Sequence, residues 1–124
     1  MDLSRSEQGT AAALVALGAF QTALAIGAPW GEAAYGGSNR GTLPHHLRAI
    51  SGVAALSYGM ATVLVLGGHG SPVGRTRAFT TLSVLMGMGT LANGASRSPV
   101  ERAVWTPVTA ATTVLAWRSR TPRA

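Results

Sequence analysis

The distribution of charge is the feature that most restricts how this sequence can fold. No residue between Glu7 and Glu32 carries a formal charge, and further stretches without charge follow Arg48, Arg77 and Arg102. A helix needs about 20 consecutive apolar residues to cross the hydrocarbon core of a bilayer. The charge pattern therefore predicts a single integral membrane domain with four membrane-spanning helices, at about residues 10–28, 47–67, 78–95 and 100–117.

The overall content of charge favours lipid over water as the surroundings of this chain. Asp, Glu, Lys and Arg make up 11% of the 124 residues, whereas a soluble domain carries roughly 25%. A soluble chain of this length would expose many Ala, Leu and Val side chains, because its ratio of surface to volume is high. We therefore expect an all-α fold, a four-helix transmembrane bundle with an up-down-up-down course and short loops.

The first predicted span has some features of a signal peptide, because Arg5 precedes it and small residues follow it. The apolar core of a signal peptide is about 7–15 residues long. The run over residues 10–28 is longer, and further spans follow it. We expect this segment to be retained as a helix of the bundle.

The positions of the arginines predict the orientation of the chain. All ten basic residues are Arg, and with four spans the two termini share one side of the membrane. That side holds Arg5, Arg75, Arg77, Arg118, Arg120 and Arg123. The other side holds Arg40, Arg48, Arg97 and Arg102. Because positive residues are enriched on the cytoplasmic side, we expect a multi-pass protein of the bacterial plasma (inner) membrane with both termini in the cytoplasm.

A net charge of +6 and a pI near 11.6 would also suit a nucleic-acid-binding protein. Such a protein gathers its basic residues on one face or element. Here the arginines mark the ends of apolar runs, as membrane anchors do. We expect no nucleic-acid partner, and we expect the lipid bilayer to be the principal surroundings of the chain.

Three motifs resemble a family of uncharacterised small bacterial membrane proteins with four helices. They are GAPWGEAAYGG at residues 27–37, LPHHLRAIS at residues 43–51 and SRSPVERAVWTPV at residues 96–108. The motifs cover both loops on the side opposite the termini and the starts of the second and fourth predicted helices. The resemblance implies a four-helix fold and a membrane location. It implies no chemistry and no catalytic residue.

The same two loops hold the candidate ligand-binding residues. These are Glu32, Arg40, His45, His46, Arg48, Arg97, Glu101 and Arg102. The loops lie on one side under any four-span arrangement, so they can meet. Arg binds phosphate and carboxylate groups in pairs through its planar fork, which would suit an anionic lipid headgroup or substrate. The alternative is structural: Glu32 and Glu101 each pair with an Arg of the other loop and fasten the loops together.

The sequence offers no set of residues for metal binding or covalent catalysis. Adjacent helical residues point about 100° apart, so His45 and His46 cannot easily share one metal ion. His69 is the only other histidine, and there is no cysteine. Neither a phosphate-binding loop nor a GxSxG motif is present. We expect no metal and no cofactor, and the residues favour a protein that is not an enzyme without deciding the question.

The predicted spans contain polar residues but none that is ionised at neutral pH, which speaks against a proton-coupled drug antiporter. Gln21 and Asn93 are amides that need partners in lipid, and each could supply the other. Gly87, Gly89 and Gly94 predict a helix-contact surface, because small residues let helix backbones approach closely. Near the N-terminus, Ser4-Arg5-Ser6-Glu7 predicts a capping box at a helix start.

Two classes of function agree with these observations. The first is a non-enzymatic accessory or scaffold protein that works through contacts with lipid, with another membrane protein or with a second copy of itself. The second is a small transporter, or a protein that binds lipid or anions, with its site at the Glu and Arg cluster of the two loops.

Overall fold

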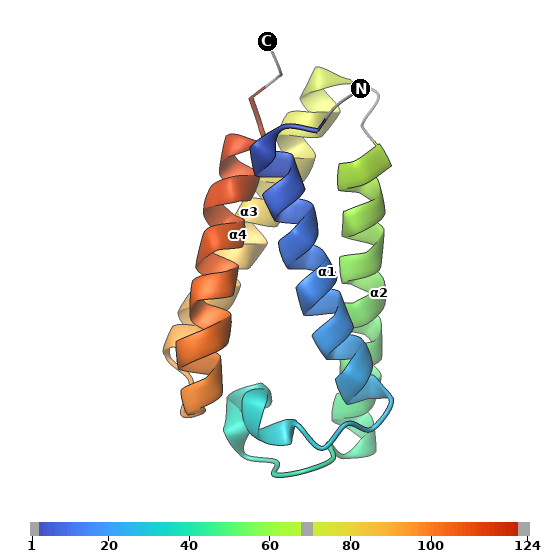
Figure 1. Ribbon diagram of the computed structural model, residues 1–124, viewed down its shortest axis with the longest axis vertical. Helices are drawn as coiled ribbons and strands as arrows, with labels where there is room; N and C mark the ends of the chain where they lie inside the picture. The colour runs from blue at the N-terminus through green and yellow to red at the C-terminus, as the bar shows by residue number, and fades with distance from the viewer. Residues whose placement is uncertain (1–2, 68–70, 122–124) are drawn as a thin grey trace.

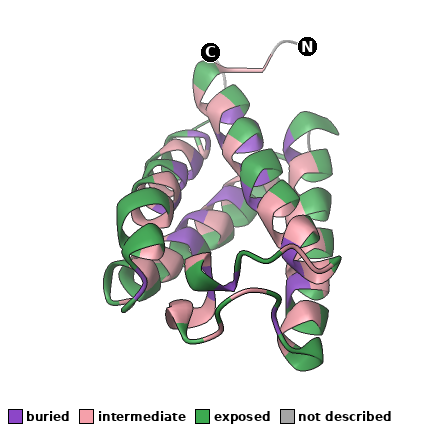
Figure 2. Ribbon diagram, turned by 60° about the horizontal axis from the view of Figure 1, so that its bottom comes forward, coloured by how far each residue is buried: buried purple, intermediate pink, exposed green. Residues whose placement is uncertain are grey.

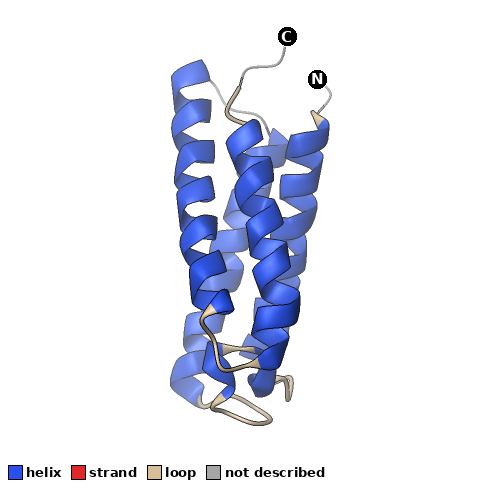
Figure 3. Cartoon of the chain, turned by 90° about the vertical axis from the view of Figure 1, so that its left-hand side faces the viewer, coloured by secondary structure: helices blue, strands red, loops and turns tan. Residues whose placement is uncertain are grey.

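The computed structural model describes residues 3–67 and 71–121. Within this part the chain is helical without strands (Figure 3), which confirms the predicted all-α class. The long helices are α1 (Arg5–Ala25), α2 (His45–Gly67), α3 (Pro72–Gly94) and α4 (Thr106–Arg118). Three short helical segments accompany them: the 3-10 helices η1 (Gly31–Ala33) and η2 (Tyr35–Gly37), and the π-helical segment η3 (Glu101–Trp105).

The predicted capping box starts α1. The Ser4 hydroxyl accepts a hydrogen bond from the Glu7 backbone N–H at 3.2 Å, and the Glu7 carboxylate accepts one from the Ser4 N–H at 2.9 Å. The two bonds satisfy donors that would otherwise be orphaned at the helix start. For this reason α1 begins five residues before the predicted span. The helix ends at Ala25, three residues before the predicted end of the span.

The segment before the third helix departs from the prediction. The sequence predicts the third span from about residue 78, but α3 already begins at Pro72, which suits the first helical turn because it needs no N–H donor there. The Ser71 hydroxyl caps the helix by accepting a hydrogen bond from Gly74 N–H at 3.0 Å. Arg75 and Arg77 therefore lie on a helix and not in a turn. His69 lies outside the described residues.

The fourth helix is divided at its start. The Thr106 N–H bonds to the Glu101 carbonyl, five residues back, which makes η3 a π-type segment. Pro107 follows directly and has no N–H to give to the regular α-helical pattern. The segment η3 runs into α4 without a break, so the predicted helix at 100–117 is present but not uniformly α-helical.

The four helices form two antiparallel hairpins. Helix α1 packs on α2, α3 packs on α4, and the hairpins meet through α1 and α4. In Figure 1, α1 begins and α4 ends at the top, while the chain reverses between α1 and α2 and between α3 and α4 at the bottom. This is the predicted up-down-up-down course. The hairpins diverge toward the bottom, and the segment between α1 and α2 lies across the wide end.

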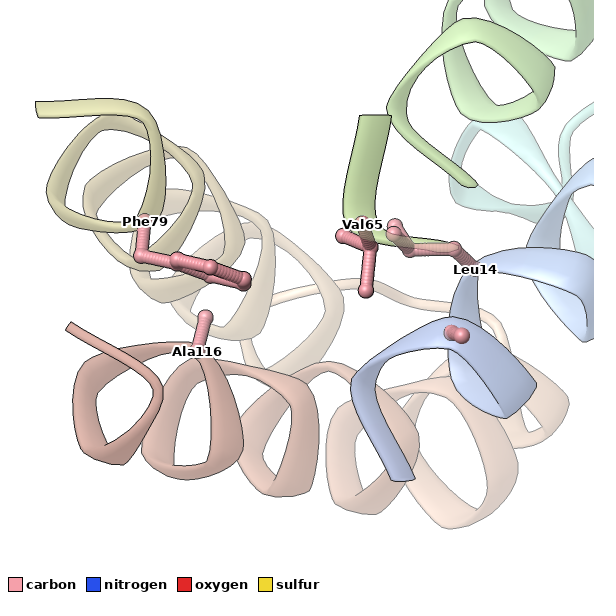
Figure 4. Close-up of a cluster of buried hydrophobic side chains, with 5 residues drawn as sticks. Leu14, Val65, Phe79 and Ala116 are labelled. Atoms are coloured by element: carbon pink, nitrogen blue, oxygen red, sulfur yellow. The ribbon is translucent and has the colours of Figure 1, made fainter. Parts of the chain in front are cut away.

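The narrow end of the bundle holds the main apolar core (Figure 4). Leu14 of α1, Val65 of α2, Phe79 of α3 and Ala116 of α4 are buried together there. A smaller apolar cluster, composed of Leu24, Ala34 and Leu43, lies at the wide end and holds the connecting segment against α1. The core therefore closes one end of the bundle, while a loop closes the other.

The contact between α3 and α4 confirms the predicted glycine surface. Added Cβ atoms at Gly87, Gly89 and Gly94 would each lie 3.7–3.9 Å from the Cγ2 methyl group of a threonine of α4. Those threonines are Thr113, Thr109 and Thr106 in turn. Because the helices are antiparallel, the glycines of one match the threonines of the other in reverse order, and the small side chains let the backbones approach closely.

The burial pattern differs from that of a water-soluble bundle. Eight polar or charged residues are buried in the described part of the chain, among them Glu7, Ser51 and Thr112. Exposed positions occur along the helices (green in Figure 2), and large apolar residues are among them, for example Leu56 at 72% exposure and Leu91 at 75%. Helices α1 and α2 are long and apolar enough to cross a membrane by length and composition.

Candidate functional site

The wide end of the bundle contains a partly open cavity of about 420 Å³. Its walls come from all four helices and η3, and residues 33–36 of the connecting segment form its floor. The volume falls within the range of about 300–1,000 Å³ that ligand pockets occupy. We call this space the loop-end cavity.

The floor is fixed by a tight turn in the connecting segment. Gly31 N–H donates to the Gly41 carbonyl at 2.8 Å, which ties the two ends of this segment together. Tyr35 and Gly36 then adopt left-handed backbone conformations, with φ of 48° and 77°. The Tyr35 side chain turns inward and its hydroxyl bonds to the Ser51 hydroxyl at 2.8 Å. The Tyr35 ring therefore lies within the bundle and not on its outer surface.

The two loops meet through Glu101, as their placement on one side predicted. Glu101 Oε1 accepts hydrogen bonds from Gly36 N–H and from the Ser96 hydroxyl, both at 2.7 Å. The Ser98 hydroxyl donates to the Glu32 carbonyl at 2.5 Å. Glu101 thus lines the loop-end cavity and joins its floor to the start of η3.

The predicted pairing of Glu32 and Glu101 with arginines of the opposite loop is wrong. Across residues 3–67 and 71–121, the ion pair that forms is Glu7 with Arg75, near the other end of the bundle. The left-handed turn places the Gly36 N–H, and not a guanidinium group, against the Glu101 carboxylate. Glu32 contributes its backbone carbonyl to the loop contact, and its side chain is exposed.

The remaining predicted site residues lie around the cavity, not in it. Exposed on the surface are Arg40, His45, His46, Arg97 and Arg102. Arg102 donates to the Ser96 carbonyl at 2.7 Å. Arg48 donates from Nε to the Ala25 carbonyl at 3.0 Å and so satisfies an acceptor at the end of α1. Of the eight residues predicted, only Glu101 lines the loop-end cavity.

Two polar atoms that are buried next to the cavity have no hydrogen-bond partner in the described part of the chain. They are Gln21 Oε1, an acceptor, and Trp105 Nε1, a donor. Both residues line the cavity, as does Asn93. The expected bond between Gln21 and Asn93 does not form, because Asn93 Nδ2 donates to the Gly89 carbonyl of its own helix at 2.9 Å. An unsatisfied buried polar group costs about 1–3 kcal/mol, so this cavity provides an acceptor and a donor that a ligand can satisfy.

Aromatic rings supply much of the remaining lining. The rings of Phe20 and Trp105 lie 4.4 Å apart between centroids at an angle of 44°. Tyr35 and Tyr58 line the same space. Such rings give a pocket large apolar contact area with few rotatable bonds. Sequence reasoning assigned no site role to these residues, because which face of a helix turns toward a cavity is not visible from the spacing of aromatic residues alone.

The comparisons with known proteins add no constraint on the site. The sequence matches no protein-family model, and no curated protein or solved structure is significantly similar to it.

Proposed function

We propose that this protein is a multi-pass integral membrane protein of the bacterial plasma membrane that binds a small molecule in the loop-end cavity and does not act as an enzyme. Two observations support this proposal. The outward-facing apolar side chains favour lipid surroundings, and the unpartnered polar atoms in the cavity favour a ligand.

The exposed apolar surface is the argument for the membrane. Within α2, the side chains of Leu56, Met60 and Val63 are 68–72% exposed, and hiding one such side chain from water contributes about 1.5–3 kcal/mol. The most apolar stretch of α2 has a mean hydropathy of 1.8, yet only 11% of it is buried inside the protein. The core helix of a soluble protein would be mostly covered, so lipid is the surroundings that suits α2.

The lengths of the other helices agree with a crossing. Helix α3 has 23 residues, which span about 35 Å at a rise of 1.5 Å per residue, and the hydrocarbon core is about 30 Å thick. The segments η3 and α4 form one helical run from Glu101 to Arg118. Buried hydroxyl groups bond within the bundle, as Thr112 does to the Val108 carbonyl at 2.7 Å. Internal satisfaction of this kind is what a bilayer requires.

The first test of the proposal is extraction of native membranes. We expect the chain to stay in the membrane pellet during washing with alkaline carbonate, because its outward-facing apolar side chains cannot be solvated by water. A peripheral protein released by the same wash serves as the control. Recovery of the chain as a soluble monomer without detergent would contradict a membrane location.

Both termini lie in the cytoplasm in this proposal, on the basis of the six arginines at their end against four at the other. The shared end of the termini is visible in the fold, since α1 begins where α4 ends (Figure 1). Of these six arginines, Arg123 lies outside the described residues. The loop-end cavity then faces the periplasmic side.

The unpartnered Gln21 carbonyl is the observation that carries the binding function. A side-chain acceptor retained without a partner lowers the stability of the free protein, and such costs are typical of sites kept for function. The described lining holds no His, Cys or Lys and no pair of carboxylates, so binding suits the cavity better than catalysis does.

We expect that Gln21→Leu raises the stability of the ligand-free protein in detergent by about 1 kcal/mol, because it removes an unsatisfied buried acceptor and keeps a similar shape. Thermal unfolding of the purified chain measures the change. Gln8→Leu is the matched control on the same helix. Because the Gln8 amide is exposed, we expect its replacement to change the stability by less than about 0.5 kcal/mol. If Gln21→Leu is instead destabilising by 1 kcal/mol or more, Gln21 has a structural role.

An accessory or scaffold role is the second candidate. Its support is α2, which buries only Ser51 and Val65 among its 23 residues and leaves the rest of its surface for other contacts. A partner protein or a second copy of the chain could cover that surface in place of lipid. The exposed Arg40 and Arg97 could also contact anionic headgroups.

A further inference from the structure

We propose that the ligand of the loop-end cavity is a small organic cation, an ammonium ion on an apolar or aromatic body, and that the Glu101 carboxylate is its counter-ion. This inference rests on the binding function proposed above and names the class of ligand for the same site.

The charge of the cavity points to a cation. Among the described residues that line the cavity, Glu101 is the one acid, and none of them is Arg, Lys or His. No arginine of the described part forms an ion pair with Glu101. A carboxylate in partly desolvated surroundings is costly unless a positive charge compensates it. A cationic ligand would supply that charge.

The hydrogen bonds of Glu101 leave room for the ligand. Its two donors, Gly36 N–H and the Ser96 hydroxyl, are both neutral, and both bond to Oε1. They hold the carboxylate in place without neutralising it. Oε2 accepts no hydrogen bond within the described residues and can accept one from an ammonium N–H. The Gln21 Oε1 atom is a second unpartnered acceptor on the same cavity.

The aromatic lining favours the same ligand class. A cation over the face of Trp, Tyr or Phe gains about 0.5–2 kcal/mol. Phe20, Tyr35, Tyr58 and Trp105 all line the space that Glu101 lines. An anion would meet this carboxylate and the negative ring faces and would be repelled. A neutral ligand would leave the charge of Glu101 uncompensated.

The experiment compares three ligands of similar shape on the full chain in an uncharged detergent. They are 2-phenylethylammonium, the neutral 2-phenylethanol and the anionic phenylacetate. Ligand-dependent thermal unfolding gives an apparent Kd for each. We expect the ammonium to bind at least tenfold more tightly than the alcohol, and phenylacetate to give no shift.

Two substitutions locate the effect. Glu101→Gln keeps an oxygen that accepts from Gly36 N–H and Ser96, so it preserves the floor of the cavity and removes only the charge. We expect it to weaken ammonium binding at least tenfold and to leave binding of 2-phenylethanol unchanged. Glu32→Gln is the matched control, because it removes the same charge from an exposed position at the same end of the bundle. We expect no change in affinity there.

The outcomes separate this inference from the proposed function. If 2-phenylethanol binds as tightly as the ammonium, or if Glu32→Gln weakens binding as much as Glu101→Gln, the inference of a cation is wrong while binding stands. Tighter binding of phenylacetate would overturn it in favour of an anion. If none of the three ligands binds, the proposed binding function fails as well. The comparison of ligands on the unaltered chain needs no variant, so it decides the question even if Glu101→Gln does not fold.

A lipid headgroup can present the same ammonium as a free amine. Two further arms distinguish these sources, with the protein in the uncharged detergent alone or with phosphatidylethanolamine added. If phosphatidylethanolamine lowers the affinity for 2-phenylethylammonium several-fold, the lipid headgroup competes for the cavity. Equal affinity with and without this lipid indicates a free amine as the ligand.

Discussion

Replacing Glu7 with Gln should lower the free energy of unfolding of the bundle by about 3–5 kcal/mol, the cost of breaking a buried ion pair by removing one partner. The side chain of Glu7 is 1% exposed and bonds to Arg75, whose side chain is 15% exposed. The substitution keeps the shape of the side chain but turns an amide toward the guanidinium, so Arg75 loses the carboxylate of Glu7. Unfolding in mixed micelles with increasing SDS measures the loss.

Two controls test that interpretation. Arg5→Gln removes an exposed charge within one helical turn of Glu7. We expect the free energy of unfolding to change by less than about 0.5 kcal/mol. The double variant Glu7→Gln with Arg75→Gln removes both charges and should recover part of the loss, because neither charge of this pair remains. If the two residues are not coupled, the double variant will be less stable than Glu7→Gln by the whole loss of free energy that Arg75→Gln causes alone.

The substitution Gly31→Ala should be nearly as damaging, and it acts at the opposite end of the bundle. A Cβ atom at Gly31 would lie 1.8 Å from the Asn39 carbonyl oxygen and 2.7 Å from that of Gly41. Both are backbone atoms, so no flexible side chain can move aside. We expect a loss of about 3 kcal/mol, at the upper end of the cost of overpacking, together with loss of ligand binding. Thermal unfolding and the apparent Kd for 2-phenylethylammonium measure the two effects.

The matched control is Gly59→Ala in α2. No atom outside its own helical surroundings lies within 4 Å of the position that its Cβ would take. Ala is a better helix former than Gly by about 1 kcal/mol, so this variant should be as stable as the original chain or more stable. If Gly31→Ala behaves like Gly59→Ala, the turn that forms the cavity floor is not as close as the structure places it.

The sequence by itself determined the four helices and their course. Stretches without charge and the capping box at Ser4 and Glu7 act through neighbouring residues, so they can be interpreted without knowledge of the fold. The same holds for the glycines of α3, whose spacing places them on one helix face. The meeting of the two loops also followed, because an up-down-up-down course leaves both at the same end.

The loop-end cavity could be predicted only in part. Glu101, Gln21 and Asn93 are prominent in the sequence because strongly polar side chains are few near the predicted spans. Their partners were predicted wrongly, with an arginine for Glu101 and an amide for Gln21. Opposite charge and complementary donors and acceptors indicate which groups could pair. The direction of the backbone at each group decides which of these pairs form.

Only the tertiary structure decided which groups meet. The Gly36 N–H reaches Glu101 because Tyr35 and Gly36 take left-handed conformations, and Gln21 stays without a partner because the two hairpins diverge toward that end. Glu7 and Arg75, 68 residues apart in the sequence, form an ion pair because α3 begins at Pro72 and brings Arg75 onto a helix. Local signals fix where helices begin and end, whereas the packing of the two hairpins against each other decides which side chains line the loop-end cavity.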